Sequence, residues 1–224
     1  MAVETVDRTR QDQQSQDQQS QDQQSQDQQS QDQQSQQERL TEAQRAELVE
    51  LAVASITRGV HYDEPLHLRD AELEGYLAEP RATFVTVYLD GELAGCIGSL
   101  EARRPLGRDI AHNAYMAAFR DPRFDPLSAD DLERLSLHIS VLSPLRELDV
   151  TSEADLVAAL EPGVHGLVLT CHGQRGTLLP SVWDQCPDPA LFVRHVKRKA
   201  GLPQDYWSDE MRALVYEVDE FDGS

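Results

Sequence analysis

The chain has 224 residues, with 40 acidic and 20 basic side chains, so its formal net charge is −20 at pH 7. A field of this sign favours solubility and disfavours non-specific binding to nucleic acid or to anionic membrane surfaces. Neither a run of about 20 apolar residues nor the apolar stretch of a signal peptide is visible. The three cysteines fit no disulfide framework, so we expect a cytoplasmic protein that does not enter the membrane.

Residues 11–35 are five tandem copies of Gln-Asp-Gln-Gln-Ser. A repeat with no apolar position buries nothing and cannot offset the entropy lost when its backbone is ordered. We therefore predict a disordered low-complexity tail over residues 1–37, which leaves residues 38–224 for a single folded domain. That length is sufficient for a sizeable hydrophobic core.

The first expected element is an amphipathic helix over residues 41–58, which begins with a capping-box pattern formed by Thr41 and Gln44. A short helix is predicted over residues 70–78, because the residue before a proline disfavours helix and Pro80 follows closely.

A β-hairpin is predicted next, from strands at residues 84–89 and 93–100. Asp90-Gly91 lies between them, and this dipeptide favours the two-residue turn in which both central residues have positive φ. Gly95 and Gly98 lie inside the second strand. Glycines at such positions indicate a bulge or a close approach of another backbone.

The rest of the chain alternates between helices and strands, separated by turn residues. Helices are expected at residues 105–119, in a short segment from Ser128, at 152–160 and at 188–200, and strands at 135–141, 166–171, 176–181 and 212–219. In the predicted order of helices and strands, hairpins outnumber the crossovers that join parallel strands. The predicted fold class is therefore α+β, with mixed helices and antiparallel hairpins.

Several short blocks resemble the AMMECR domain family. Residues 93–98, Leu-Ala-Gly-Cys-Ile-Gly, are similar to the family signature LRGCIG. Residues 121–127 resemble its block DPRFxPL, and residues 139–143 resemble its block ISVLS. Later blocks at Gly163, Leu179-Pro180 and Lys199-Ala200-Gly201-Leu202 follow in the family's order, so the resemblance covers about residues 40–221.

The resemblance implies an α+β fold with a larger and a smaller subdomain and with the signature near their junction. It also implies a relationship to the bacterial branch called AmmeMemoRadiSam system protein A, and hence an association with radical SAM and Memo-like proteins. No reaction is attached to the fold. Two positions depart from the family pattern: Ala94 replaces the signature arginine, and His138 replaces a glutamate.

Cys96 is the main candidate for a catalytic residue, since it lies between Gly95 and the pair Ile97-Gly98, where a substrate could approach a thiolate. A nucleophilic cysteine also needs a base or a positive neighbour. No histidine is adjacent to Cys96 in the sequence, so His112 or His138 could act as that base only if the fold brings it close. The alternative interpretation is a small buried cysteine between glycines that allow close packing.

Three other residues are candidates through the motifs. Arg123 is expected to fix its loop through ion pairs, His138 is expected on the polar side of its strand, and Lys199 closes the basic run 194–199. That run either complements a helix C-terminus or binds an anion. The His and Cys spacing matches no zinc site, so we predict neither a metal nor a cofactor.

Three functions remain open from the sequence. The chain could be an enzyme or accessory factor of a modification pathway centred on Cys96, a non-catalytic adaptor for a protein partner, or an RNA- or nucleotide-binding protein that uses the basic run. The acidic composition makes nucleic acid the least favoured partner.

Overall fold

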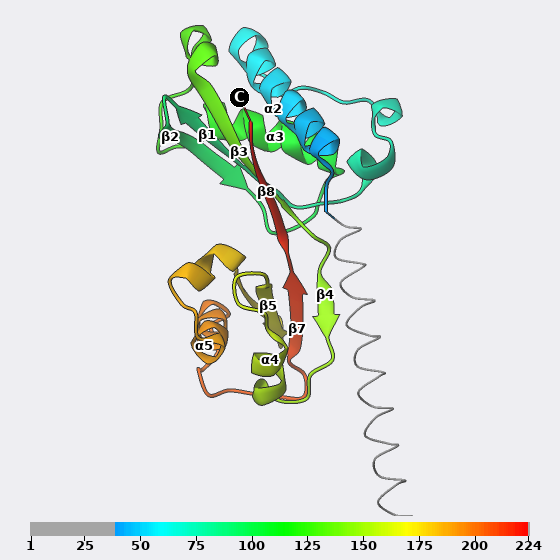
Figure 1. Ribbon diagram of the computed structural model, residues 1–224, viewed down its shortest axis with the longest axis vertical. Helices are drawn as coiled ribbons and strands as arrows, with labels where there is room; N and C mark the ends of the chain where they lie inside the picture. The colour runs from blue at the N-terminus through cyan, green and yellow to red at the C-terminus, as the bar shows by residue number, and fades with distance from the viewer. Residues whose placement is uncertain (1–38, 224) are drawn as a thin grey trace, which may run out of the picture. The chain divides into compact units, whose positions relative to one another are not determined.

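Two four-stranded antiparallel sheets organise the computed structural model, which describes residues 39–223 (Figure 1). The expected tail at residues 1–37 lies outside these residues. The first sheet has the order β2-β1-β3-β8 and the second has the order β4-β7-β5-β6. The strands are β1 Thr83–Leu89, β2 Glu92–Gly98, β3 Leu135–Leu142, β4 Arg146–Leu148, β5 Gly166–Cys171, β6 Gln174–Leu178, β7 Arg212–Tyr216 and β8 Val218–Gly223.

Two helices, α2 (Glu42–Tyr62) and α3 (Leu106–Phe119), pack against one face of the first sheet. Alternate residues along most of β1 and β3 are buried on that face, including Val85, Val87 and Ile139, as expected for a strand with one face on the core. We call the opposite side of this sheet the outer face. It carries the other set of alternating side chains.

The helix ends follow the capping signals in the sequence. The Thr41 hydroxyl accepts a hydrogen bond from the Gln44 amide, and the Gln44 side chain accepts one from the Thr41 amide, which confirms the predicted capping box. Helix α2 nevertheless continues beyond residue 58. It ends where Asp63 adopts a left-handed conformation with φ of 56°.

The second sheet packs against α4 (Glu153–Ala159) and α5 (Pro189–Lys199) around its own hydrophobic cluster. Trp183 and Phe192 stack in this cluster with ring centroids 3.8 Å apart. Asp188 caps α5 by accepting a hydrogen bond from the Ala190 amide, and Gly201 follows the helix with φ of 76°. Both ends agree with the sequence.

Two extended segments run through both sheets. β3 leads into β4, and β7 leads into β8 through Glu217 alone; in Figure 1 the two strands β7 and β8 follow one another in line. The Ser143 amide donates to the Glu217 carbonyl over 2.9 Å, so the two segments are hydrogen-bonded where they cross. The single strand predicted at 212–219 is therefore two strands of different sheets.

Other differences from the sequence prediction are local. Residues 70–78 form two short 3₁₀ turns, Asp70–Glu72 and Gly75–Ala78, and the segment after Ser128 is also a 3₁₀ helix. Segments this short lack the length that makes an α-helix favourable. β4 was not predicted, because a three-residue strand carries no clear periodicity.

The β5–β6 turn is tighter than the expected four residues. Cys171 pairs with Gln174, so His172 and Gly173 alone make the turn, with φ values of 49° and 80°. Asp90-Gly91 makes the β1–β2 turn in the same way, as predicted, with φ values of 51° and 84°.

Helices combined with two antiparallel sheets confirm the α+β fold class. Across residues 39–223, no helix has the length and apolar character needed to span a membrane.

Candidate functional site

β2, which carries Cys96, is an edge strand of the first sheet. The loop after α3 contacts its free edge. The Cys96 amide donates to Asp121 Oδ2 over 2.9 Å, and Arg123 Nη2 donates to the Cys96 carbonyl oxygen over 3.2 Å. Two motif blocks that lie 25 residues apart are thus joined at the Cys96 backbone. The contact also protects the edge against pairing with another strand.

Asp121 and Arg123 are bound to each other as well as to β2. Arg123 Nε donates to Asp121 Oδ1 over 2.9 Å and Arg123 Nη2 donates to Oδ2 over 2.7 Å, a bidentate pair. These hydrogen bonds from Arg123, followed by the one from the Cys96 amide, hold the pKa of Asp121 far below its usual range. The geometry matches the interpretation of Arg123 as a residue that fixes its loop through ion pairs.

The signature glycines allow close packing. A Cβ atom at Gly95 would lie 2.0 Å from the Ala117 carbonyl oxygen of α3, and one at Gly98 would lie 2.3 Å from the Phe84 ring. Ile97 is half-buried opposite Val85 of β1. Close packing alone therefore explains why glycine stands at both positions. Any chemistry at this strand depends on Cys96.

Cys96 belongs to a row of four side chains that crosses the outer face of the first sheet. Strand pairing sets Cys96 opposite Thr86, Thr86 opposite His138, and His138 opposite Asp222. Thr86 Oγ1 donates to the Cys96 sulfur over 3.3 Å, and His138 Nδ1 lies 2.8 Å from Asp222 Oδ1. We call these four residues the outer-face row.

The thiol in this row is neither sealed in hydrocarbon nor paired with a base. Cys96 is half-buried, whereas Cys171 and Cys186 are buried. Because neighbouring strands lie about 4.8 Å apart, Cys96 and His138 are separated by roughly 10 Å. The two side chains therefore form no direct Cys–His dyad. They could act together only on a molecule that lies across Thr86.

The outer-face row places a histidine beside a carboxylate at its end on β8. His138 Nδ1 contacts the carboxylate of Asp222, which lies on another strand. Ala94 is half-buried on β2, and its methyl group cannot supply the hydrogen bonds of an arginine. Sequence reasoning missed Thr86 and Asp222, because their roles depend on which strands pair, and spacing along the chain does not reveal that.

His112 and Lys199 lie elsewhere. His112 lines a hollow of about 210 Å³ with His67, Arg104 and Arg108. Burial, and then the charge of Arg104, lowers the pKa of His112. Lys199 is exposed at the last residue of α5.

The predicted basic run 194–199 is not one surface. Lys197 is fully buried, with its Nζ 2.6 Å from Glu153 Oε2 and 3.2 Å from the Gln204 carbonyl oxygen. The ion pair of this lysine with Glu153 joins α5 to α4. The run therefore loses one of its cations as a possible anion-binding group.

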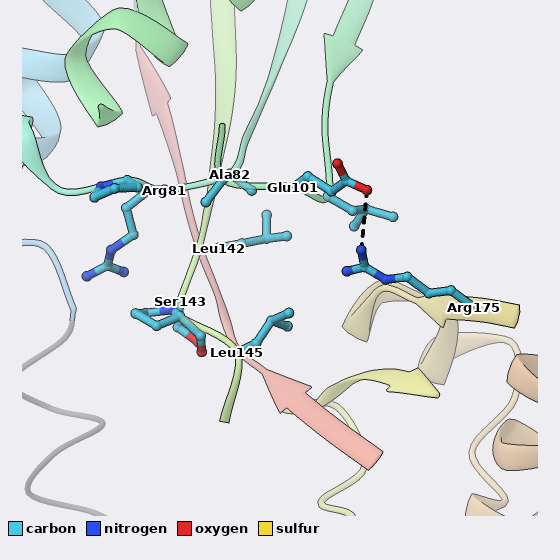
Figure 2. A pocket seen from close by; sticks show the side chains of 11 residues that line it. Arg81, Ala82, Glu101, Leu142, Ser143, Leu145 and Arg175 are labelled. Atoms are coloured by element: carbon cyan, nitrogen blue, oxygen red, sulfur yellow. Dashed lines mark hydrogen bonds and ion pairs between the residues drawn. The ribbon is translucent and has the colours of Figure 1, made fainter. Parts of the chain in front are cut away.

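A second hollow, of about 220 Å³, lies where β1 begins and where β2 and β3 end (Figure 2). We call it the strand-end hollow. Ala82, Leu100, Leu142 and Leu145 contribute apolar side chains to it, and Arg175 reaches it from β6. Within residues 39–223, no three His, Cys, Asp or Glu side chains gather as metal ligands would.

Comparisons with known proteins agree with the motif blocks. The AMMECR1 family model matches residues 49–221. Protein MK0488 of Methanopyrus kandleri is 36% identical over 194 residues, covering 82% of this chain and 90% of that protein. A protein of Thermotoga maritima is 31% identical over 175 residues, covering 77% of this chain and 95% of that protein.

A solved structure supports the fold. The crystal structure of uncharacterized protein PH0010 from Pyrococcus horikoshii matches with a TM-score of 0.62 and 26% sequence identity. The match covers 79% of this chain and 90% of that chain. The family resemblance drawn from the sequence is thereby confirmed.

Proposed function

The chain belongs to the AMMECR1 family, and from this premise we propose that it is an enzyme or accessory factor of a modification pathway shared with radical SAM and Memo-like proteins. Cys96 is the centre of its working surface. The substrate lies across the outer face of the first sheet and contacts both Cys96 and His138.

One observation carries this role. The Cys96 thiol is half-buried and accepts a hydrogen bond from Thr86, and the hydrogen-bonded pair His138–Asp222 completes the same cross-strand row. A thiol that takes part in chemistry must be accessible and must have polar or charged neighbours. Cys171 and Cys186 are buried in the hydrophobic cluster of the second sheet and do not meet the condition of accessibility.

Alkylation under native conditions tests the accessibility of the thiol. With iodoacetamide and site-resolved mass spectrometry, Cys96 is expected to react much faster than Cys171 and Cys186, which act as internal controls because they are 2% and 3% exposed. If Cys96 resists the reagent as strongly as these two cysteines, it is not accessible and the proposed working surface is refuted.

Complementation tests the function itself. In a strain that lacks this chain, C96S and C96A are expected to behave like the deletion, whereas C186A restores the wild-type phenotype. Folding of each variant is checked by circular dichroism. If C96S and C96A both restore the phenotype in full, Cys96 has no chemical role.

Affinity purification tests the association. The wild-type chain, co-expressed with the radical SAM and Memo-like proteins of its own genome, is expected to recover at least one of them at physiological salt. Recovery of neither protein would contradict the shared pathway, even if Cys96 proves reactive.

The adaptor alternative finds less support. Docking of a permanent partner calls for a contiguous apolar surface of several hundred Å². Among residues 39–223, the large apolar side chains that are exposed are Tyr62 on α2, Leu93 on β2, Leu145 between β3 and β4, and Leu191 on α5, so they belong to four different elements or loops. Burial of Lys197 likewise weakens an RNA- or nucleotide-binding role.

The functional domain under this proposal is residues 38–224, and it works in the cytoplasm with residues 1–37 as a dispensable tail. Free thiols at all three cysteines suit a reducing compartment. A variant that lacks residues 1–37 is expected to complement as well as the full chain, and failure to do so would assign the tail a role.

A further inference from the structure

We propose that the strand-end hollow binds a small aliphatic carboxylate through Arg175. This site is separate from Cys96, which does not line the hollow. Its volume of about 220 Å³ corresponds to roughly seven water molecules at ~30 Å³ each. A branched acid of six carbons fits a space of that size.

The floor of the hollow is apolar. Ala82 and Leu142 belong to a buried hydrophobic cluster that also includes Leu100 at its edge. Leu145, at the rim, is 43% exposed and is among the few large apolar side chains with that much exposure in residues 39–223. An aliphatic group placed here would cover Leu145 and extend the cluster, which favours an apolar ligand.

Arg175 supplies the charge that selects a carboxylate. Its guanidinium has five N–H donors, and within residues 39–223 its hydrogen bond is a single contact of 3.3 Å from Nη1 to Glu101 Oε1. Figure 2 shows this contact at one side of the hollow, to the right of Leu142. Two of the free donors can engage a ligand carboxylate in the bidentate geometry that arginine favours.

Glu101 does not depend on Arg175. Arg103 Nε donates to Glu101 Oε2 over 2.8 Å, and this hydrogen bond, rather than the charge of Arg175, is the main cause of the lowered pKa of Glu101. A ligand carboxylate can therefore replace Glu101 at Arg175 while Glu101 keeps Arg103. An amine ligand would find Glu101 already surrounded by two cations.

Isothermal titration calorimetry with 4-methylpentanoate tests the proposal, and backbone NMR shifts locate the site. Saturable binding is expected below about 10 mM, with shifts at Ala82, Leu100 and Leu145. The neutral isostere 4-methylpentanamide is expected to bind about tenfold more weakly, because it loses the charge-assisted hydrogen bonds. No saturable binding of the acid, or equal binding of acid and amide, overturns the proposal.

Matched variants assign the residues. R175Q is expected to weaken binding about tenfold, whereas R198Q, the same change at an exposed arginine of α5, leaves it unchanged. E101Q is expected to strengthen binding by removing the competing carboxylate. L145N weakens binding and L191N, at a similarly exposed leucine, does not.

Equal affinities of R175Q and R198Q would refute the role of Arg175. C96S is expected to bind the acid like the wild type. Failure at this hollow therefore leaves the proposed role of Cys96 untouched, and the two proposals can fail separately.

Discussion

Asp121 is the residue on which the local geometry of β2 depends. Its carboxylate accepts hydrogen bonds from the Cys96 amide and from Arg123. D121N removes the negative charge and leaves Arg123 without its ion-pair partner, so we expect lower stability at pH 7 than in the wild type. D125N, an exposed aspartate of the same loop, is the matched control and should have no measurable effect.

The effect of D121N should depend on pH in one direction. The folded-state pKa of Asp121 is lowered, chiefly by hydrogen bonds from Arg123, so the ionised carboxylate stabilises the fold. That stabilisation is complete above the unfolded pKa near 4 and is lost as the pH falls toward the folded pKa. Urea unfolding at pH 7, 5, 4 and 3 should show the gap between wild type and D121N narrowing below about pH 4. A gap that widens in acid would contradict this assignment.

The approach of α3 to β2 is the contact most sensitive to a single methyl group. G95A places a Cβ atom 2.0 Å from the Ala117 carbonyl oxygen, and a backbone atom cannot move aside as a side chain can. We expect a loss of about 1–3 kcal/mol in the free energy of unfolding, measured by urea titration.

G107A is the control for this prediction. A Cβ atom there would meet only the ends of leucine side chains at 3.1 Å and beyond, and alanine favours the helix that contains it. Its effect should stay below about 1 kcal/mol. Equal losses in G95A and G107A would show that the α3–β2 contact can relax.

The pairing of α4 with α5 depends on a buried ion pair. Lys197 is fully buried while the side chain of its partner Glu153 is 32% exposed. E153L leaves a buried charge unpaired, which costs about 3–5 kcal/mol. K197M leaves a carboxylate that water can reach, so its cost in urea titrations should be clearly smaller. E153Q keeps an acceptor and should be intermediate. A larger loss in K197M than in E153L would contradict this explanation.

Individual elements were predictable from the sequence where the signal is local. The capping box at Thr41, the start of the helix predicted over residues 188–200 and the Asp90-Gly91 turn each depend on residues within four positions, and the structure has all three. The outer-face row was not predictable, because Thr86 and Asp222 meet Cys96 and His138 only through strand pairing across long sequence separations. Lys197 was read as part of a charged surface for the same reason. Its partner Glu153 lies 44 residues away.

At the scale of the whole molecule, two continuous segments each contribute one strand to both sheets. β7 and β8 are consecutive along one extended segment but pair in different sheets, and the β3–β4 segment does the same in the opposite direction. Loss of a strand from one sheet therefore disturbs the segment that continues into the other sheet at Glu217. We expect both sheets to unfold in one cooperative transition, as small single domains do.

Two probes can report on the sheets separately. Both tryptophans, Trp183 and Trp207, pack in or against the hydrophobic cluster of the second sheet, so their fluorescence follows that sheet. Hydrogen exchange at the β1 and β3 amides, followed by mass spectrometry, reports on the first sheet. In urea, the tryptophan transition and the loss of β1 and β3 protection should share one midpoint, because the crossing segments connect the two hydrogen-bond networks. Fluorescence that changes at clearly lower urea than the exchange of β1 and β3 would mean that the second sheet unfolds alone, and that Glu217 is a hinge between independent units.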